Sequence, residues 1–176
     1  MSLQNTRSPS PCVVIIMGVS GSGKSTIGTL LAQQLRWGFE DADSFHPAAN
    51  VEKMRNRIPL TDGDRKPWLE AIANRIDAIL HAGGHGVITC SALKRRYRRV
   101  LIGERANVRL VYLQANEPVI AQRLAARRDH FMPPSLLKSQ FEALEAPGPD
   151  ENPITVLIEP QPLEIVEKII SKLKIG

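Results

Sequence analysis

The sequence is poor in several residue types, and each shortage narrows the possible functions. Only two of the 176 residues are cysteine, Cys12 and Cys90, too few for the disulfide framework of a small secreted domain. Both lie in apolar runs, so we expect two buried thiols within strands. No stretch reaches the roughly 18 apolar residues of a membrane span. Aromatic residues make up 5% of the chain, which disfavours a stacking platform for single-stranded nucleic acid.

The N-terminal residues and the net charge bear on the domain bounds, the possible partners and the cellular location. Residues 1–11 are polar, rich in Ser and Pro, and lack the hydrophobic core of a signal peptide. We therefore expect a disordered tail over residues 1–11 and a single domain over residues 12–176. The net charge of +5 is compatible with nucleic acid, an anionic membrane or a phosphorylated substrate as partner. With the expected reduced thiols, the pattern predicts a cytoplasmic protein.

Short apolar runs alternate with helical periodicities along the chain. Buried strands are expected at residues 12–17, 39–41, 87–90, 108–113 and 154–158. Residues 56–65 are expected to form a loop, followed by a long helix over 67–80. This alternation predicts an α/β fold with a mostly parallel sheet. Residues 127–152 contain several prolines and no expected strand, which indicates a functional lid.

A phosphate-binding motif follows the first expected strand. Residues 18–25 match G-x-x-x-x-G-K-[ST] in full, between a strand and a helix. Lys24 is expected to reach the β- and γ-phosphates and to act in catalysis, and the Ser25 hydroxyl to bind Mg²⁺. The alternative is a Gly/Ser-rich turn without a nucleotide. The expected ATP-binding residues here are Gly18, Val19, Ser20, Gly21, Ser22, Gly23, Lys24, Ser25 and Thr26.

Two motifs of other nucleotide-binding proteins are missing from the sequence. A GTPase should carry the base-reading motif N/T-K-x-D, which the chain lacks. Helicases and transporters usually have an apolar strand that ends in Asp, whereas residues 89–91 here read Thr-Cys-Ser. The second protein contact to a metal ion must therefore come from elsewhere.

The pair Asp41 and Asp43 supplies carboxylates just after the short second strand. We expect the two carboxylates to face different groups. We assign Asp41, with Ser25, to the metal side, and Asp43 to the acceptor, where it would orient a hydroxyl and take its proton. The alternative is two surface aspartates in a turn.

Polar and basic residues further along the chain are candidate ligands for an acidic acceptor. The expected acceptor-binding residues, beside Asp43, are His46, Lys53, Ser91, Lys94 and Arg98. Lys94 and Arg98 are i,i+4 neighbours on a helix that follows the third strand, off the apolar stripe that must face the core. The alternatives are a solvated charged face or a patch that faces RNA.

Arginines that lead into the expected lid are candidates for contact with the transferring phosphate. Arg123 and Arg127 share a helix face. A lid arginine would neutralise charge that develops during transfer, and lid closure would exclude water. We therefore expect both to bind ATP and Arg127 to act in catalysis.

Longer motifs extend over nearly all of the chain after the tail. They lie at residues 18–26, 41–47, 50–54, 59–69, 90–98, 130–132, 140–141 and 145–148. Together they resemble the gluconate kinases (gluconokinases) of the shikimate-kinase-like group. The resemblance implies transfer of phosphate from ATP, with Mg²⁺, to D-gluconate, giving 6-phospho-D-gluconate. It also implies a three-layer P-loop kinase fold, with a five-stranded parallel sheet, helices on both faces and a mobile lid. A homodimer with no nucleic-acid or membrane partner is expected.

The chain departs from that family pattern at two positions. Arg57 and Asp129 stand where the family usually has glycine, which puts the geometry of the acceptor loop and the lid in question. Three other functions stay open at this point. One is a kinase of another small acid such as shikimate. Another is a nucleic-acid-binding ATPase that uses basic residues 94–99. The third is a nucleotide-binding regulator without catalysis.

Overall fold

The computed structural model describes residues 10–126 and 134–173. Most of the expected tail lies outside these residues, as do Arg127, Asp129 and His130 of the expected lid. Within the described part of the chain, no helix is both long enough and apolar enough to cross a bilayer.

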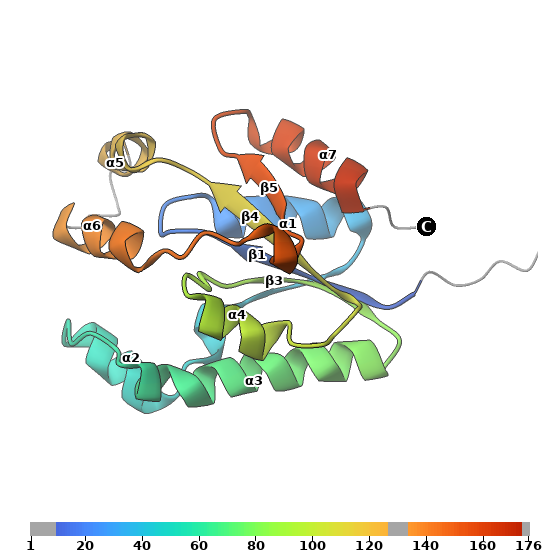
Figure 1. Cartoon of the computed structure of the whole chain (residues 1–176), viewed down its shortest axis with the longest axis horizontal. Coiled ribbons are helices and arrows are strands. Elements are labelled where there is room, and N and C mark those ends of the chain that lie inside the picture. The colour runs from blue at the N-terminus through green and yellow to red at the C-terminus, as the bar shows by residue number, and fades with distance from the viewer. Residues whose placement is uncertain (1–9, 127–133, 174–176) are drawn as a thin grey trace, which may run out of the picture.

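Five parallel strands form one sheet at the centre of the molecule (Figure 1). They are β1 (Cys12–Met17), β2 (Gly38–Asp41), β3 (His85–Thr89), β4 (Val108–Gln114) and β5 (Ile154–Leu157), in the spatial order β2-β3-β1-β4-β5. β1 pairs in parallel with both β3 and β4. Each expected strand is present, so the predicted α/β fold with a parallel sheet is confirmed. All five carboxyl ends lie on the same edge, where such sheets bind ligands.

Helices cover both faces of the sheet. They are α1 (Lys24–Leu35), α2 (Ala48–Arg55), α3 (Asp62–His81), α4 (Arg95–Leu101), α5 (Glu117–Ala125), α6 (Pro134–Ala143) and α7 (Pro162–Leu173), with 3₁₀ turns η1 (Ala42–Phe45) and η2 (Pro149–Glu151). Figure 1 shows α1 and α7 on one face and α3 and α4 on the other. The expected three layers are therefore present.

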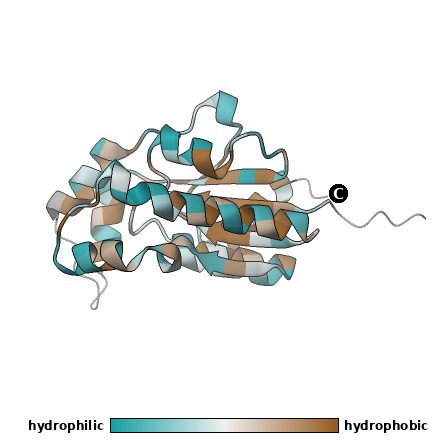
Figure 2. Cartoon of the chain, turned by 90° about the horizontal axis from the view of Figure 1, so that it is seen from below, coloured by the Kyte–Doolittle hydropathy of each residue, from teal (hydrophilic) through white to brown (hydrophobic). Residues whose placement is uncertain are grey.

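The central strand β1 supplies side chains to both faces. Val14 and Ile16 pack in the core beneath α1 and α7, whereas Val13, Ile15 and Met17 pack in the core beneath α3 and α4. All five side chains are 0% exposed, as expected for a parallel strand covered on both sides. Figure 2 shows the result, with apolar residues concentrated in the strands and hydrophilic residues recurring along the outer helices.

The long helix α3 begins five residues before the expected start at Pro67. Its N-cap is Thr61, whose side chain accepts a hydrogen bond from the Asp64 N–H, while the Asp64 carboxylate accepts from the Thr61 N–H at 2.8 Å. This reciprocal arrangement is a capping box, which satisfies two otherwise unpaired N–H groups. The expected loop over 56–65 was therefore wrong for residues 62–65. The signal that locates the helix start was the Thr-x-x-Asp spacing.

Arg57 ends α2 in the conformation that a glycine would favour. Its φ is +58°, in the left-handed region. The Ile58 N–H donates to the Lys53 carbonyl at 2.8 Å and the Arg57 N–H to the Met54 carbonyl at 3.1 Å. These two bonds define a Schellman motif, which is commonly closed by glycine. Arg57 therefore adopts the backbone conformation typical of glycine at this position, although its Cβ makes that conformation unfavourable.

The expected lid region contains more regular structure than the sequence indicated. Helix α6 and the turn η2 both lie within residues 127–152. Residues 144–148 connect them and cross over α4. We name residues 144–151 the strap. Its start lies beside the segment that follows β3, since the Glu145 N–H donates to the Leu93 carbonyl at 2.9 Å, and its end lies just before β5.

Candidate active site

The loop between β1 and α1 forms an anion-binding turn. Gly23 is the N-cap of α1 at φ +93° and provides no side-chain cap. The first N–H groups of the helix are therefore available to an anion, which the helix dipole also favours. Gly21 adopts φ +82°, and a Cβ there would lie 3.1 Å from Ile120 and 3.2 Å from Leu124. The loop thus needs glycine both for its turn and for its contact with α5.

Lys24 lies over this loop in a partly buried position. Its Nζ donates to the carbonyl oxygens of Gly18 and Val19, each at 3.1 Å. Burial lowers the pKa of the Lys24 ammonium, and the nearby carboxylate of Asp43 opposes that shift. An ammonium that is short of solvent interacts strongly with an added anion. Lys24 is therefore placed to exchange its two carbonyl partners for phosphate oxygens.

Ser25 and Asp41 meet at the carboxyl end of β2, as expected for a metal-side pair. The Ser25 hydroxyl donates to Asp41 Oδ2 at 3.1 Å, and Asp41 Oδ1 accepts from the Asp43 N–H at 3.0 Å. Among the described residues, no group of three or more His, Cys, Asp or Glu side chains gathers to hold a metal ion. Two hard oxygen donors suit Mg²⁺, which takes few protein ligands and fills its other positions with water and phosphate oxygens.

Two cavities meet at this edge of the sheet. One, of about 290 Å³, contains the phosphate loop, Lys24, Ser25 and Asp41. The other, of about 320 Å³, lies between α3, α4 and α6. Both are lined by Ser20, Asp43 and Ser91. Asp43 therefore stands at the junction of a phosphate pocket and a second pocket, which we name the acceptor pocket.

The acceptor pocket carries an excess of positive charge around one aromatic ring. Arg65, Lys94 and Arg96 lie with their charged groups 5.9, 5.7 and 5.6 Å from the centroid of the Tyr97 ring. Arg65 and Lys94 line the pocket. Asp62 offsets part of the charge, since it contacts Arg96 and the Tyr97 hydroxyl and lies 3.5 Å from Lys94. The attraction between a cation and the face of an aromatic ring is favourable. The combined positive charge of these side chains suits an anionic ligand.

His46 forms one wall of the acceptor pocket. Its ring stacks on Trp68 with centroids 4.3 Å apart, and Nδ1 lies 3.3 Å from Asn50 Nδ2. The Trp68 N–H donates to the Ala42 carbonyl at 2.7 Å, which joins this wall to the turn that carries Asp43. Burial lowers the pKa of the His46 ring, so near neutral pH the ring is a neutral hydrogen-bonding group.

Several expected site residues take up other positions. Lys53 forms an ion pair with Asp64 at 2.7 Å and does not line the acceptor pocket. Arg123 donates to the backbone carbonyl of Ile158. Arg127 lies outside the described residues.

The expectation that Arg98 lies off the buried stripe of its helix is wrong. Its side chain is 1% exposed and pairs with Glu151 at 2.6 Å. It does not line the acceptor pocket. The burial arises because the strap covers this face of α4 and supplies a carboxylate partner. Ser91 and Lys94, by contrast, do line the pocket as expected.

Four polar or aromatic residues that line the acceptor pocket were not among the predicted site residues. They are Arg65, Trp68, Tyr97 and Gln140. Arg65 and Trp68 lie in the 59–69 motif and Tyr97 in the 90–98 motif, so these motifs held the available signal. The carbonyl of the Gln140 side chain accepts from the Ser20 N–H at 2.7 Å across 120 residues of chain. That contact joins α6 to the phosphate loop.

Comparisons with known proteins agree with this geometry. A family model described as an AAA domain matches residues 13–147. The chain is 46% identical to a gluconokinase of Gluconobacter oxydans (strain 621H), covering 91% of this chain and 90% of that protein. It is 42% identical to the thermoresistant gluconokinase of Escherichia coli (strain K12), covering 93% and 94%.

A solved structure gives the same result. A gluconokinase from Sinorhizobium meliloti 1021 superposes with a TM-score of 0.83 at 40% identity, covering 93% of this chain and 92% of that one. The alignment extends over almost the whole of each chain. The chain therefore belongs to the gluconokinase family of P-loop kinases.

Proposed function

We propose that this chain transfers the γ-phosphate of ATP to a hydroxyl of D-gluconate, giving 6-phospho-D-gluconate and ADP. The proposal rests on the family and on one structural observation, the position of Asp43 between the two pockets. Phosphoryl transfer needs a positioned hydroxyl and a group that accepts its proton. A carboxylate at the junction of a phosphate pocket and an acceptor pocket supplies that group.

In the proposed reaction, the residues of the two pockets act together on the γ-phosphoryl group and the acceptor hydroxyl. The acceptor hydroxyl oxygen forms a bond to the γ-phosphorus while the bond from phosphorus to the β,γ-bridging oxygen breaks. The hydroxyl proton passes to Asp43, and ADP leaves with the bonding electron pair. Lys24 releases the Gly18 and Val19 carbonyls and donates to phosphate oxygens. Ser25 and Asp41 would hold Mg²⁺, which supplies positive charge to the phosphates.

The acceptor pocket suits a polyhydroxy acid. Arg65 and Lys94 would hold the carboxylate, because charge-assisted hydrogen bonds to a carboxylate are the strong ones. His46 and Ser91, which line the same pocket as Asp43, would bond acceptor hydroxyls. Arg127 stays the predicted lid arginine, which would neutralise negative charge on the transferring phosphoryl group.

The basic segment 94–99 does not support a nucleic-acid-binding ATPase. Four of its cations are paired with carboxylates, namely Lys94 and Arg96 with Asp62, Arg95 with Asp150 and Arg98 with Glu151. Paired charges attract phosphate backbones less than an open basic patch does. A homodimer and a cytoplasmic location remain predictions.

The test is ADP production by the purified chain with ATP, Mg²⁺ and one acceptor at a time. The acceptors are D-gluconate, related sugar acids and shikimate, with an assay lacking acceptor as the baseline. We expect D-gluconate alone to stimulate turnover strongly and mass spectrometry to locate the new phosphate on its C6 oxygen. Stimulation by shikimate instead, or by no acid while ATP still binds, would contradict the proposal.

A further inference from the structure

Residues 91–94 form a short segment that lines the acceptor pocket and whose backbone is fixed at three successive carbonyls. The Ser91 carbonyl accepts from the Gly18 N–H of the phosphate loop at 3.4 Å. The Ala92 and Leu93 carbonyls accept from Arg98 Nη1 at 3.0 and 3.2 Å. The segment therefore contacts the phosphate loop at one end and a buried arginine at the other. Its geometry affects both pockets, because Ser91 lines both.

Ala92 holds an unfavourable backbone conformation within this segment. Its φ is +43°, in the left-handed region that residues with a Cβ rarely adopt. The residue stands between Ser91 and Lys94, the two polar side chains of this segment that line the acceptor pocket. Such a conformation persists only when the surroundings hold it. The bond from Arg98 to the Ala92 carbonyl is a direct source of that restraint.

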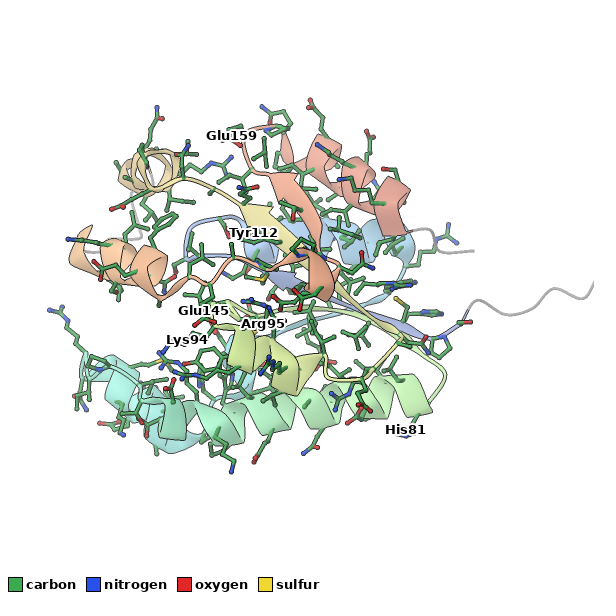
Figure 3. The ribbon with its side chains drawn as sticks, in the orientation of Figure 1. His81, Lys94, Arg95, Tyr112, Glu145 and Glu159 are labelled. Atoms are coloured by element: carbon green, nitrogen blue, oxygen red, sulfur yellow. The ribbon has the colours of Figure 1, made fainter. Side chains whose placement is uncertain are left out.

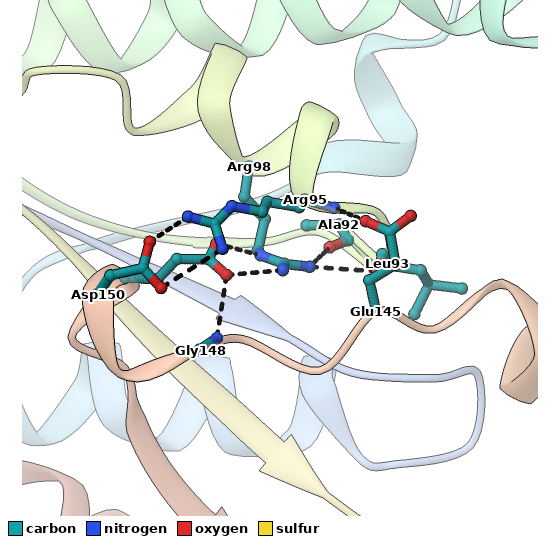
Figure 4. Close-up of polar contacts among 8 residues, drawn as sticks. Ala92, Leu93, Arg95, Arg98, Glu145, Gly148 and Asp150 are labelled. Carbon is teal, nitrogen blue, oxygen red and sulfur yellow. Dashed lines mark hydrogen bonds and ion pairs between the residues drawn. The ribbon is translucent and has the colours of Figure 1, made fainter.

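Arg98 itself makes four side-chain hydrogen bonds, two to Glu151 and two to the carbonyls of residues 92 and 93 (Figure 4). Its Nε and Nη2 donate to the two carboxylate oxygens of Glu151 at 2.6 and 2.8 Å. Glu151 Oε1 also accepts from the Gly148 N–H at 3.2 Å. A buried charge pair is tolerated when further hydrogen bonds satisfy it. Here those bonds fix the plane of the guanidinium and so the direction of Nη1 toward the two carbonyls.

A second ion pair joins the same parts of the chain without touching these carbonyls. Arg95 pairs with Asp150 on the outside of the strap, where the side chains are 41% and 59% exposed. Figure 3 shows Lys94, Arg95 and Glu145 close together where α4 meets the strap. The Glu145 N–H donates to the Leu93 carbonyl at 2.9 Å. Removal of the Arg95–Asp150 pair, the outer pair, is therefore a control that weakens attachment of the strap to α4 without changing the bonds to the Ala92 and Leu93 carbonyls.

We propose that Arg98 and Glu151 are positioning residues for phosphate transfer, which hold residues 91–94 so that Ser91 and Lys94 face the acceptor. The inference rests on the proposed function, because it assigns the acceptor to this pocket. Neither residue contacts the acceptor. Their effect passes through the Ala92 and Leu93 carbonyls, so it falls on binding of the acceptor more than on binding of ATP.

Three variants separate positioning from stability. The double variant Arg98→Met with Glu151→Leu removes both charges together, so no unpaired charge is left buried and the chain can fold. Arg98→Lys keeps one positive charge and fewer donors. The control is Arg95→Gln with Asp150→Asn, which removes the outer pair. Each is assayed for the KM of D-gluconate, the KM of ATP, kcat and the melting temperature.

We expect the buried double variant to raise the KM for D-gluconate by roughly tenfold or more, with the KM for ATP within about twofold of wild type. Arg98→Lys should lie between it and wild type, and the outer-pair control should match wild type. An unchanged KM for D-gluconate in a folded double variant would overturn the proposal. So would equal increases in both KM values together with a matching loss of melting temperature, which indicate a purely structural role.

A second measurement does not depend on the acceptor. Amide hydrogen exchange at Glu145 reports the bond to the Leu93 carbonyl, and exchange at Gly18 reports the bond to the Ser91 carbonyl. Both amides should exchange faster in the buried double variant and be unchanged in the outer-pair control. If wild type does not phosphorylate D-gluconate, the proposed function fails, and faster exchange still supports the positioning of this segment. Unchanged exchange at both amides contradicts the positioning.

Discussion

Replacement of Asp43 by Asn removes the carboxylate at the junction of the two pockets and little else. The new side chain has nearly the same shape. The bond from the residue 43 N–H to Asp41 Oδ1, at 3.0 Å, uses the backbone and so is kept. The residue is exposed to the pocket rather than packed in the core. We therefore expect no measurable change in melting temperature.

The expected loss of activity follows from the role of the carboxylate. A positioned general base contributes roughly 10²- to 10⁴-fold to the rate, so kcat should fall by that factor, or about 3–5 kcal/mol in the barrier. Asp43 also opposes the burial that lowers the Lys24 pKa. Without it that pKa falls further in the free enzyme, but bound phosphate supplies new negative charge. The KM for ATP should therefore change little.

The matched comparison is Asp41→Asn, two residues away on the metal side. Asp41 contacts the Ser25 hydroxyl, so this variant should need more Mg²⁺ for half-maximal rate and regain activity as Mg²⁺ is raised. Asp43→Asn should stay slow at every Mg²⁺ concentration. The assay is steady-state ADP production with D-gluconate and ATP saturating, across a Mg²⁺ titration. The reasoning is refuted if Asp43→Asn keeps kcat within about fivefold of wild type, or if excess Mg²⁺ restores it.

Three further outcomes are expected. Gln140→Ala removes the acceptor of the Ser20 N–H and should raise the KM values for both substrates in steady-state assays, while Ser139→Ala on the same helix should not. Arg57→Gly relieves a φ of +58° and should raise the free energy of unfolding in urea by about 1 kcal/mol; a decrease would contradict the cap assignment. The Lys53 ammonium and hydrogen bonds from Thr61 lower the pKa of Asp64 from 3.8 to about 2, so its contribution to stability is present above pH 3.8 and is lost as pH falls toward 2. Acid unfolding should therefore be less steep over this range in Asp64→Asn, and parallel profiles would refute that reasoning.

Local features of the chain were predictable because near neighbours determine them. The turn of the phosphate loop depends on glycines at fixed positions between a buried strand and a helix, and all of these lie within residues 12–35. Strand alternation does not explain the separate positions of Asp41 and Asp43, because residues two apart in a strand share a face. The two carboxylates differ because Asp41 ends β2 and caps the 3₁₀ turn η1, in which Asp43 lies. Ser25 contacts Asp41, and Asp43 lines the acceptor pocket.

The start of α3 and the end of α2 show where local reading was incomplete. The residues of a capping box, Thr61 and Asp64, were present in the sequence. The helix start was instead predicted at Pro67, five residues too late. Arg57 was recognised as a departure from glycine. Its left-handed conformation depends on two backbone bonds that close the helix, so its identity alone could not give its geometry.

Tertiary structure determined which of the basic residues 94–99 are buried and which line the acceptor pocket. By its spacing, Arg98 was expected to be exposed and to bind the acceptor, whereas its partner Glu151 lies 53 residues further along the chain. Burial of an arginine is favourable only where such a partner and further hydrogen bonds are supplied. Helical periodicity describes one helix and cannot include the segment that later covers it. The sequence by itself therefore determined the phosphate chemistry, and only the folded chain determined which cations face the acceptor and which hold the pocket in shape.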